Sequence, residues 1–445
     1  MKKIFLILIL FYSLTSFPFY FENDIDYKIY IIEKMLNFEA LDTSISPYPS
    51  KEKNIYKKNS SNVYIQIPYF HTNNYELAPI FEYKNNNFGL KFNMTNSHNL
   101  ILEMYFGKRI NSFWFILGRY QTDWSLMEHG VFLSDSLPFV DGITGGFTTN
   151  FLLGSMGIYF GAYSFNSYLT EEEFNIQRMH IDGNSDRRSI NEGYYDPYKT
   201  LMIHRLDLKP LNFVRVSINE LNLIGGKLPD IVDLNFMNIL HNTYGEGYSN
   251  AMFAIDGEIV PLNGIKIYGE LAMDDFVVPL TESGAESYKP TALAWAYGIK
   301  SAFKKNNFYF TAKYEEYKIY SWMYNRWQEL LKFTGRYIDD KIYDIPMGYD
   351  YGSGIESKLI SLEFLKSNVD IKIMFEKINQ GEINLNTSYF DTDLKGNTET
   401  WEGPYGDIKE YYYTTLNLDL NNLFFEVKFD KFLPIEYKIN YKIIF

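Results

Sequence analysis

The chain ends in Ile435-Glu-Tyr-Lys-Ile-Asn-Tyr-Lys-Ile-Ile-Phe445, a segment in which every second residue is apolar or aromatic. Successive side chains of a β-strand point to opposite faces, so this segment has one wholly apolar face. Soluble proteins avoid leaving such a long apolar edge exposed at the end of a chain. The segment therefore indicates a strand whose apolar face meets lipid.

The same alternation recurs along the chain, for example over residues 88–95, 265–272 and 369–376. In a soluble sandwich the apolar face would pack on a second sheet, and in a membrane barrel it would face lipid. Alternation alone leaves both folds open. The terminal segment favours the barrel, because it resembles the closing strand by which outer-membrane barrels are recognised for assembly.

Length and composition fit one large barrel. About 390 residues follow Tyr56, and at about ten residues per strand they suffice for about 18 strands, with 16 as the alternative. Aromatic residues make up 18% of the chain, as expected for a barrel with interfacial girdles. The expected fold class is all-β transmembrane: a single antiparallel outer-membrane β-barrel with helical loop insertions that occlude the lumen.

The N-terminus has the layout of a secretory signal peptide: Lys2 and Lys3 precede an apolar run from Ile4 to Leu14. Eleven residues are too few for a membrane helix, which needs about 20. We expect residues 1–16 to be a cleaved signal peptide, residues 17–55 a periplasmic helical segment, and residues 56–445 the barrel. Cysteine is absent, which excludes a lipid-anchored N-terminus, disulfides and thiolate metal sites.

Three segments have helical periodicity: Asp24–Phe38, Asp230–Tyr244 and Ser321–Phe333. The first precedes the barrel, and the other two lie between strands. Because a helix cannot join the sheet, we expect these two segments to cap or plug the lumen.

Several charged residues fall on the inward parity of their strands and are expected to line the lumen. They are Arg205, Asp207, Arg215, Asp256, Glu258, Lys266, Glu270 and Asp274. Buried charges need partners, so we expect ion pairs across the lumen; a path for polysaccharide or ions is the alternative. Glu220 shares the parity of outward apolar residues, which predicts a strand end or a bulge at this position.

A group of aromatic residues near one arginine is the candidate carbohydrate site: aromatic faces stack on pyranose rings, and arginine suits acidic sugars. Its members are Trp322, Tyr324, Arg326, Trp327 and Trp401. The alternative is an interfacial girdle or core role, because Trp and Tyr anchor barrels at the headgroups.

Enzyme motifs are missing: there is no His-Glu-x-x-His, no Gly-x-Ser-x-Gly and no phosphate-binding glycine loop. Asp274 and Asp275 would point to opposite faces of a strand, so they cannot act as a carboxylate pair. We expect no catalytic residues, no metal site and no cofactor. The net charge of −13 argues against a nucleic-acid partner.

A block of motifs goes beyond composition. In order, it comprises His204–Pro210, Val216–Glu220, Gly225–Lys227, Leu234–Phe236, Ser249–Met252 and Ile267–Phe276, preceded by Leu117-Gly118-Arg119. Together with the leading helix, this order resembles the Wzi-type capsule-assembly family of outer-membrane proteins. The sequence departs from the family after Trp124, where Ser125-Leu126-Met127-Glu128 replaces a glycine-rich turn.

The resemblance implies a barrel with an occluded lumen that attaches capsular polysaccharide to the cell surface without catalysis. We therefore expect an outer-membrane protein that binds or anchors capsular or other surface polysaccharide. Its other partners would be outer-membrane lipid and, during insertion, the barrel-assembly machinery. The alternative function is a general porin-type diffusion channel, which would differ in having an open interior.

Overall fold

This computed structural model describes residues 19–20, 25–46, 48–49, 60–69, 78–84, 88–93, 101–151, 153–175, 198–226, 228–229, 249–275, 290–338, 342–389, 394, 396–420, 423–431 and 433–444. The expected signal peptide and the expected helix over 230–244 lie outside these residues. No helix in the described ranges is both long and apolar enough to cross a membrane.

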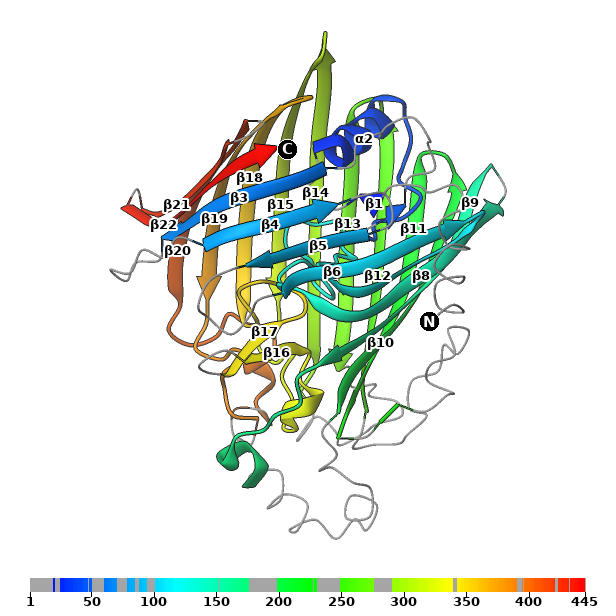
Figure 1. Cartoon of the computed structure of the whole chain (residues 1–445). Coiled ribbons are helices and arrows are strands. Elements are labelled where there is room, and N and C mark those ends of the chain that lie inside the picture. The colour runs from blue at the N-terminus through cyan, green and yellow to red at the C-terminus, as the bar shows by residue number, and fades with distance from the viewer. Residues whose placement is uncertain are drawn as a thin grey trace, which may run out of the picture.

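Eighteen strands of the described chain form one closed antiparallel barrel (Figure 1). They are β3 (Ser60–Tyr69), β4 (Ala78–Lys84), β5 (Phe88–Asn93), β6 (Ile101–Ile110), β7 (Phe113–Tyr120), β8 (Val140–Phe151), β9 (Gly154–Phe165), β10 (Lys199–Leu211), β11 (Val214–Gly225), β12 (Ser249–Leu262), β13 (Ile265–Asp275), β14 (Ala292–Lys305), β15 (Phe308–Ile319), β18 (Ile355–Lys366), β19 (Val369–Gln380), β20 (Lys409–Leu420), β21 (Leu423–Asp430) and β22 (Leu433–Ile444). Pairing of β22 with β3 closes the barrel between the two ends of the chain. The barrel and its expected strand number are confirmed.

The alternation read from the sequence is present in the wall. In β12 and β13, Ile255 and Ile267 are 43% and 47% exposed, whereas their neighbours Asp256 and Lys266 are buried. An exposed apolar face and a buried polar face are what a barrel in lipid requires.

Glu220 departs from its expected position. It lies inside β11 in regular register, opposite His204 on one side and Phe253 on the other, with no bulge at this point. The prediction of a strand end or bulge was wrong, because β11 is buried on both faces from Asn219 to Gly225. A buried outward side chain there does not have to be apolar, and the Glu220 carboxylate lies 3.7 Å from the ring of His204.

The two ends of the barrel differ. At one end the strands are joined by turns of two residues, such as 111–112, 263–264 and 306–307; at the other end the connections include 121–139, 320–354 and 381–408. Outer-membrane barrels have short turns on the periplasmic side and longer loops on the outside. We call these the turn end and the loop end.

The leading helix expected over residues 24–38 is present as α2 (Ile25–Leu36), which lies at the turn end of the barrel, towards the top of Figure 1. Its Ile32 is fully buried in a cluster with Tyr309 and Leu365 of the wall. The amide of Gly264, in the turn between β12 and β13, donates to the carbonyl of Met35 at 2.8 Å. The two-residue strands β1 (Phe19–Tyr20) and β2 (Tyr48–Pro49) pair with each other.

The helix expected over residues 321–333 is absent. This segment consists of turns and one 3-10 turn, η2 (Glu329–Leu331), before the hairpin of β16 (Thr334–Ile338) and β17 (Ile342–Pro346). Tyr324 has a φ of 66°, which a right-handed helix does not allow. Trp322, Met323 and Tyr324 are all buried, so the segment packs on every side instead of presenting one apolar face.

Candidate functional site

Two loops occupy the barrel interior, and we call their described residues together the plug: residues 121–139, between β7 and β8, and residues 320–338 and 342–354, between β15 and β18. The first loop touches inward side chains from several walls. Trp124 donates to Tyr163 of β9 at 3.2 Å, Ser125 donates to Glu270 of β13 at 2.6 Å, and Glu128 pairs with lysines of β15 and β19. This loop therefore crosses the lumen.

The plug has a hydrophobic core of its own that is continuous with the wall. Trp124, Phe132, Leu133, Trp322 and Phe333 are at most 1% exposed and belong to one buried cluster with wall residues. The loops also bind each other: the amide of Ser134 donates to the carbonyl of Met347 at 2.8 Å. At about 25 cal/mol per Å² of buried apolar surface, such a core contributes many kcal/mol to holding the loops inside.

Five of the charged residues expected to line the lumen form one buried ion network. Arg205 binds Asp207 at 2.7 Å and Asp256 at 3.0 Å, and Arg215 binds Asp256 at 3.0 Å and Glu258 at 3.5 Å. Each side chain is at most 1% exposed. The expected pairing of these charges is thus present, but the pairs join the neighbouring strands β10, β11 and β12 and do not cross the lumen as predicted.

The network also fixes the plug. The two terminal nitrogens of Arg205 donate to the carbonyl of Trp124 at 2.9 Å and to the Ser44 hydroxyl at 2.8 Å. Removing one partner from such a buried group is costly, because the remaining charge stays buried and unpaired. One arginine therefore joins the wall, the plug and the segment that follows α2.

The other three predicted residues bind backbone or carboxylate groups. Glu270 accepts from the amide of Val131 at 3.2 Å, and Asp274 accepts from the amide of Tyr324 at 3.1 Å, so each holds one plug loop. Lys266 binds Glu258 at 3.3 Å. All eight predicted lumen residues are buried and engaged with protein; whether any of them contacts a ligand stays a prediction.

The predicted carbohydrate residues do not gather in one cleft. Trp322 and Tyr324 are 1% and 0% exposed, and Trp401 is 8% exposed. Trp327 packs against the same core, and Arg326 forms an ion pair with Asp275. In this arrangement the two most buried rings contact protein on both faces, and sugar binding by this group stays a prediction.

A cleft at the loop end offers surface chemistry that the sequence did not single out. We call it the rim cleft; it measures about 340 Å³ and lies where β7, β8 and β9 meet β16. Its lining includes Arg119, Phe139, Asp141, Ser164, Asn166 and Tyr337. Of these, only Arg119 carried a sequence signal, as part of the Leu-Gly-Arg motif.

The rim cleft has a rigid base. Arg119 binds Asp141 through two hydrogen bonds of 2.8 and 2.7 Å, and its guanidinium lies 4.0 Å from the centre of the Phe139 ring. Tyr337 meets the same ring edge-on at 5.0 Å and donates to the Phe139 carbonyl at 2.6 Å. Burial raises the pKa of the Tyr337 hydroxyl, which keeps it a donor. A planar cation, aromatic rings and polar side chains thus converge at one surface.

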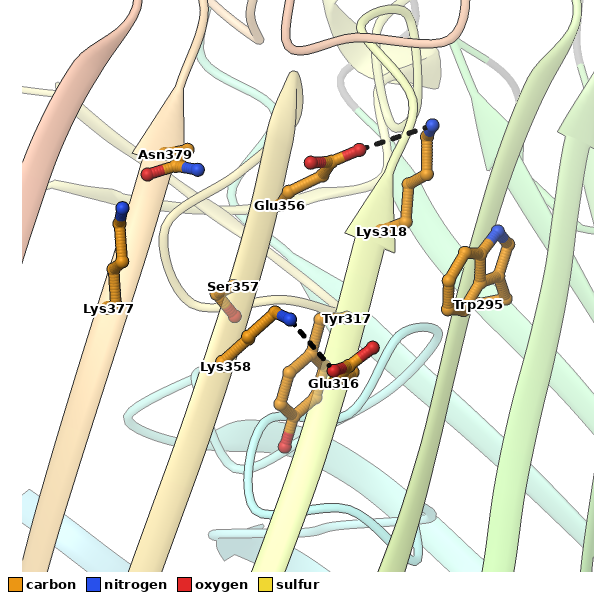
Figure 2. A pocket seen from close by; sticks show the side chains of 9 residues that line it. All are labelled: Trp295, Glu316, Tyr317, Lys318, Glu356, Ser357, Lys358, Lys377 and Asn379. Atoms are coloured by element: carbon orange, nitrogen blue, oxygen red, sulfur yellow. Dashed lines mark ion pairs between the residues drawn. The ribbon is translucent and has the colours of Figure 1, made fainter.

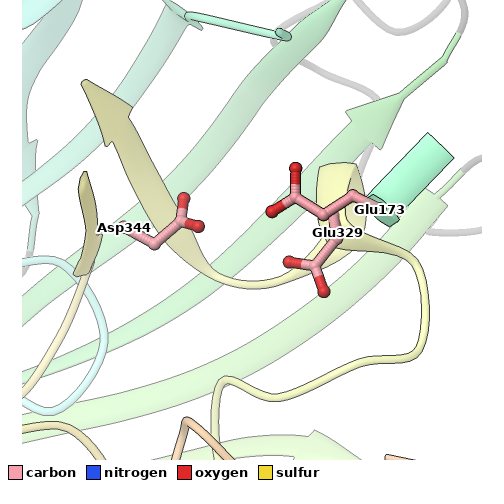
Figure 3. Close-up of side chains that lie close together, drawn as sticks. All are labelled: Glu173, Glu329 and Asp344. Carbon is pink, nitrogen blue, oxygen red and sulfur yellow. The ribbon is translucent and has the colours of Figure 1, made fainter. Parts of the chain in front are cut away.

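Arg336, which also lines the rim cleft, gathers three carboxylates from separate segments; Figure 3 shows these three carboxylates. It binds Glu173 at 2.6 Å and Asp344 at 2.8 Å, and it lies 3.9 Å from Glu329. Burial opposes ionisation of Glu173 and Asp344, but Arg336 outweighs it and holds the pKa of both carboxyls below the usual range. The carboxylate oxygens lie within 4.8 Å of one another, as in a cation site, and the arginine supplies the cation.

Comparison with known proteins bears on the fold. No family model and no curated protein matches the chain. Among solved structures, Wzi of Escherichia coli, described as an outer membrane protein involved in group 1 capsule assembly and a carbohydrate-binding β-barrel, aligns with 97% of this chain and 100% of its own at a TM-score of 0.60. The chain has the fold of Wzi. The identity is 12%. The outer membrane protein OprD of Pseudomonas aeruginosa aligns with 91% of this chain and 98% of its own at 11% identity and a TM-score of 0.44.

The likeness to Wzi confirms, for the fold, the resemblance indicated by the motif block and the leading helix. At 12% identity it says nothing of individual residues. The chemistry of the site must therefore come from this chain's own side chains, in the plug and at the rim.

The outer wall of this Wzi-like barrel has a second cleft, of about 310 Å³, on β14 to β19 (Figure 2). Lys318 of β15 binds Glu356 of β18 at 3.2 Å, and Lys358 binds Glu316 at 3.0 Å. These outward side chains lie towards the loop end, beyond the exposed Ile360. Charged pairs that follow an apolar band indicate where the wall leaves the hydrocarbon.

Proposed function

We propose that this protein is a non-catalytic outer-membrane barrel that binds capsular or other surface polysaccharide on its loop end, at the rim cleft. The plug carries the proposal: two loops with a hydrophobic core of their own fill the interior of a closed barrel. A filled barrel presents a rigid outer surface instead of a wide channel. The likeness to Wzi, which is described as binding carbohydrate, supports the proposal.

The chemistry of the rim cleft suits an acidic polysaccharide. Arg119 and Arg336 both line it, and although each is paired with carboxylates of the chain, a guanidinium has five N–H donors and can share them with a carboxylate of the polymer. Ser164 and Asn166 offer groups for sugar hydroxyls, and the Phe139 ring offers an apolar face. Long loops face outward in outer-membrane barrels, so the cleft would meet the polymer at the cell surface.

The proposal includes a route to the membrane. A signal peptide over residues 1–16 would direct export, residues 17–55 would stay in the periplasm, and the barrel-assembly machinery would insert residues 56–445 through the closing strand. The apolar outward face, with side chains such as Ile255 and Ile267, would then contact outer-membrane lipid.

Calorimetric titration of the refolded protein with a polyuronate tests the binding proposal, with neutral dextran as the control polymer. We expect Arg119→Gln to lower the affinity for polyuronate about tenfold or more, since a hydrogen bond to a charged group contributes about 1.5–3 kcal/mol. Arg109→Gln, at the turn end of the neighbouring strand β6, is the matched control. Equal affinity in Arg119→Gln and the wild type would contradict the rim cleft as the site.

A further inference from the structure

The lumen holds a cavity of about 120 Å³ on the turn side of the plug, between α2, the loop 121–139 and the wall strands β13 to β19. It is distinct from the rim cleft, which lies at the opposite end of the barrel. Five lysines line it: Lys28, Lys266, Lys300, Lys313 and Lys372. At about 30 Å³ per water molecule, the cavity has room for roughly four waters or one small oxyanion.

Three of these lysines stand in a row across neighbouring strands. Lys266 of β13 lies directly opposite Lys300 of β14, and Lys300 lies directly opposite Lys313 of β15. Like charges at directly opposed positions of a sheet destabilise it. On the outer face of β15 the chain places Glu356 opposite Lys318 instead, which is the stabilising arrangement. The row of three lysines therefore lowers the stability of the folded barrel, whereas lysines placed opposite carboxylates would raise it.

The outer two lysines of the row are compensated. Lys266 binds Glu258 at 3.3 Å, and Lys313 binds Glu315 at 3.4 Å as well as Glu128 of the plug. The compensation of these two lysines comes from carboxylates of the wall and the plug.

The middle lysine of the row, Lys300, is paired more weakly than its two neighbours. Its nearest carboxylate, Glu363, is 3.9 Å away, beyond hydrogen-bond range, and Glu363 already binds Lys28 of α2 at 3.1 Å. Within the described residues, no hydrogen bond is found for the Lys300 ammonium. Besides Glu363, two carboxylates line the cavity: Glu128, which binds Lys372, and Asp135.

We propose that this cavity is a binding site for a small oxyanion, a phosphate or a carboxylate group, held by Lys300 and flanked by Lys266 and Lys313. An oxyanion beside Lys300 would supply a counter-charge at hydrogen-bond distance, which Glu363 at 3.9 Å does not, in a partly open space bounded by α2 and the plug. The Ser361 hydroxyl, opposite Lys313 in β18, offers a further donor. The group would come from a free anion or from an acidic sugar.

Calorimetric titration of the refolded full chain with inorganic phosphate and, separately, with glucuronate tests the site. Binding of phosphate alone would identify a free anion as the ligand, and binding of glucuronate would identify the carboxylate of a sugar. In parallel, we expect the unfolding midpoint to rise by about 3 °C in phosphate relative to chloride at equal ionic strength. No binding of either probe at millimolar concentration would overturn the proposal without any variant.

Lys300→Gln assigns the effect to the row. We expect this variant to lose the phosphate-dependent shift and, in chloride, to be at least as stable as the wild type, because it removes the repulsion between neighbouring lysines. Lys358→Gln, on the outward face of β18, is the matched control and should keep the shift. A shift of wild-type size in Lys300→Gln would overturn the assignment. Arg119→Gln, at the rim cleft, should leave the phosphate-dependent shift of the unfolding midpoint unchanged. The proposal for the lysine row and the proposal for the rim cleft can therefore fail separately.

Discussion

His129 illustrates how single side chains hold the plug. Its ring lies between Asp350, 2.9 Å from Nδ1, and Glu376, 3.3 Å from Nε2, with the Tyr349 ring edge-on at 5.5 Å. Burial opposes the charged form, but the two carboxylates outweigh it and raise the pKa of His129 well above its ordinary 6.5. The imidazolium is therefore an ionic contact between one plug loop, the other plug loop and β19.

The raised pKa of His129 predicts a pH dependence of stability. A group whose pKa is higher in the folded state stabilises fully below its unfolded value, about 6.5, and loses that contribution as the pH rises through the folded value. We expect the free energy of unfolding to fall on the alkaline side of pH 7 in the wild type, and less so in His129→Gln. Urea unfolding from pH 6 to 10 measures this. Parallel pH profiles of the two proteins would contradict it.

Arg336 also contributes to stability through its three carboxylate partners. Arg336→Gln leaves Glu173, Glu329 and Asp344 facing one another without their cation, which should cost about 2 kcal/mol, less than for a fully buried pair because all three carboxylates are partly exposed. We expect millimolar Ca²⁺ to restore much of the lost stability in the variant and to leave the wild type unchanged. Thermal unfolding with and without Ca²⁺ checks this. If Ca²⁺ did not change the thermal stability of the variant, the three carboxylates would have to move apart when Arg336 is replaced.

The helix α2 is the element that closes the turn end of the lumen. Ile32 is fully buried against the wall, and Lys28 binds Glu363 at 3.1 Å and Asp370 at 2.6 Å. We expect Ile32→Ala to lower the free energy of unfolding by about 2–3 kcal/mol, as for other large-to-small core changes. Ile29→Ala, which packs only partly buried against the same cluster, should cost less. Equal costs measured in urea would mean that α2 does not dock through Ile32.

The plug is the element that separates the proposed function from a diffusion channel. We expect the wild type to give no large steady conductance in a planar bilayer. Replacing residues 125–134 by a short Gly-Ser linker should open a conducting path, because the eighteen-strand wall does not depend on this loop for its pairing. Large steady conductance from folded wild-type protein would overturn the polysaccharide proposal in favour of a porin.

At the scale of the whole molecule, the charged groups of the interior lie in different regions along the barrel axis. The rim cleft at the loop end has aromatic rings and arginines that are paired with carboxylates. Towards the turn end, the lysine row adjoins the Arg205 network, which ties the plug to the wall, through the ion pair of Lys266 with Glu258. The outward face is apolar in the band between these ends. A net charge of −13 therefore coexists with one local excess of cations, the five lysines that line the cavity on the turn side.

The sequence by itself determined the barrel, its expected strand number, the leading helix and which parity of each strand faces inward. These follow from local patterns: a period of two in strands, a period of 3.6 in α2, and the apolar terminal strand. That Arg205 would have a counter-ion could be anticipated, because a buried charge on an inward parity needs one, but which residues are its partners came from the structure. Within a strand, each side chain's direction is set by its immediate neighbours in the chain.

Only the tertiary structure decided where the loops go and which residues share a site. From the sequence, Trp322 and Tyr324 could belong to a carbohydrate site or have a girdle or core role, and packing of the plug buried them. No sequence pattern indicated that Tyr337 would meet Phe139, or that Lys300 would stand between two lysines. Register between strands and the course of long loops depend on closure of the whole barrel, which brings together residues up to hundreds of positions apart. No local pattern carries that information, because its energy comes from contacts that exist only once the barrel has closed.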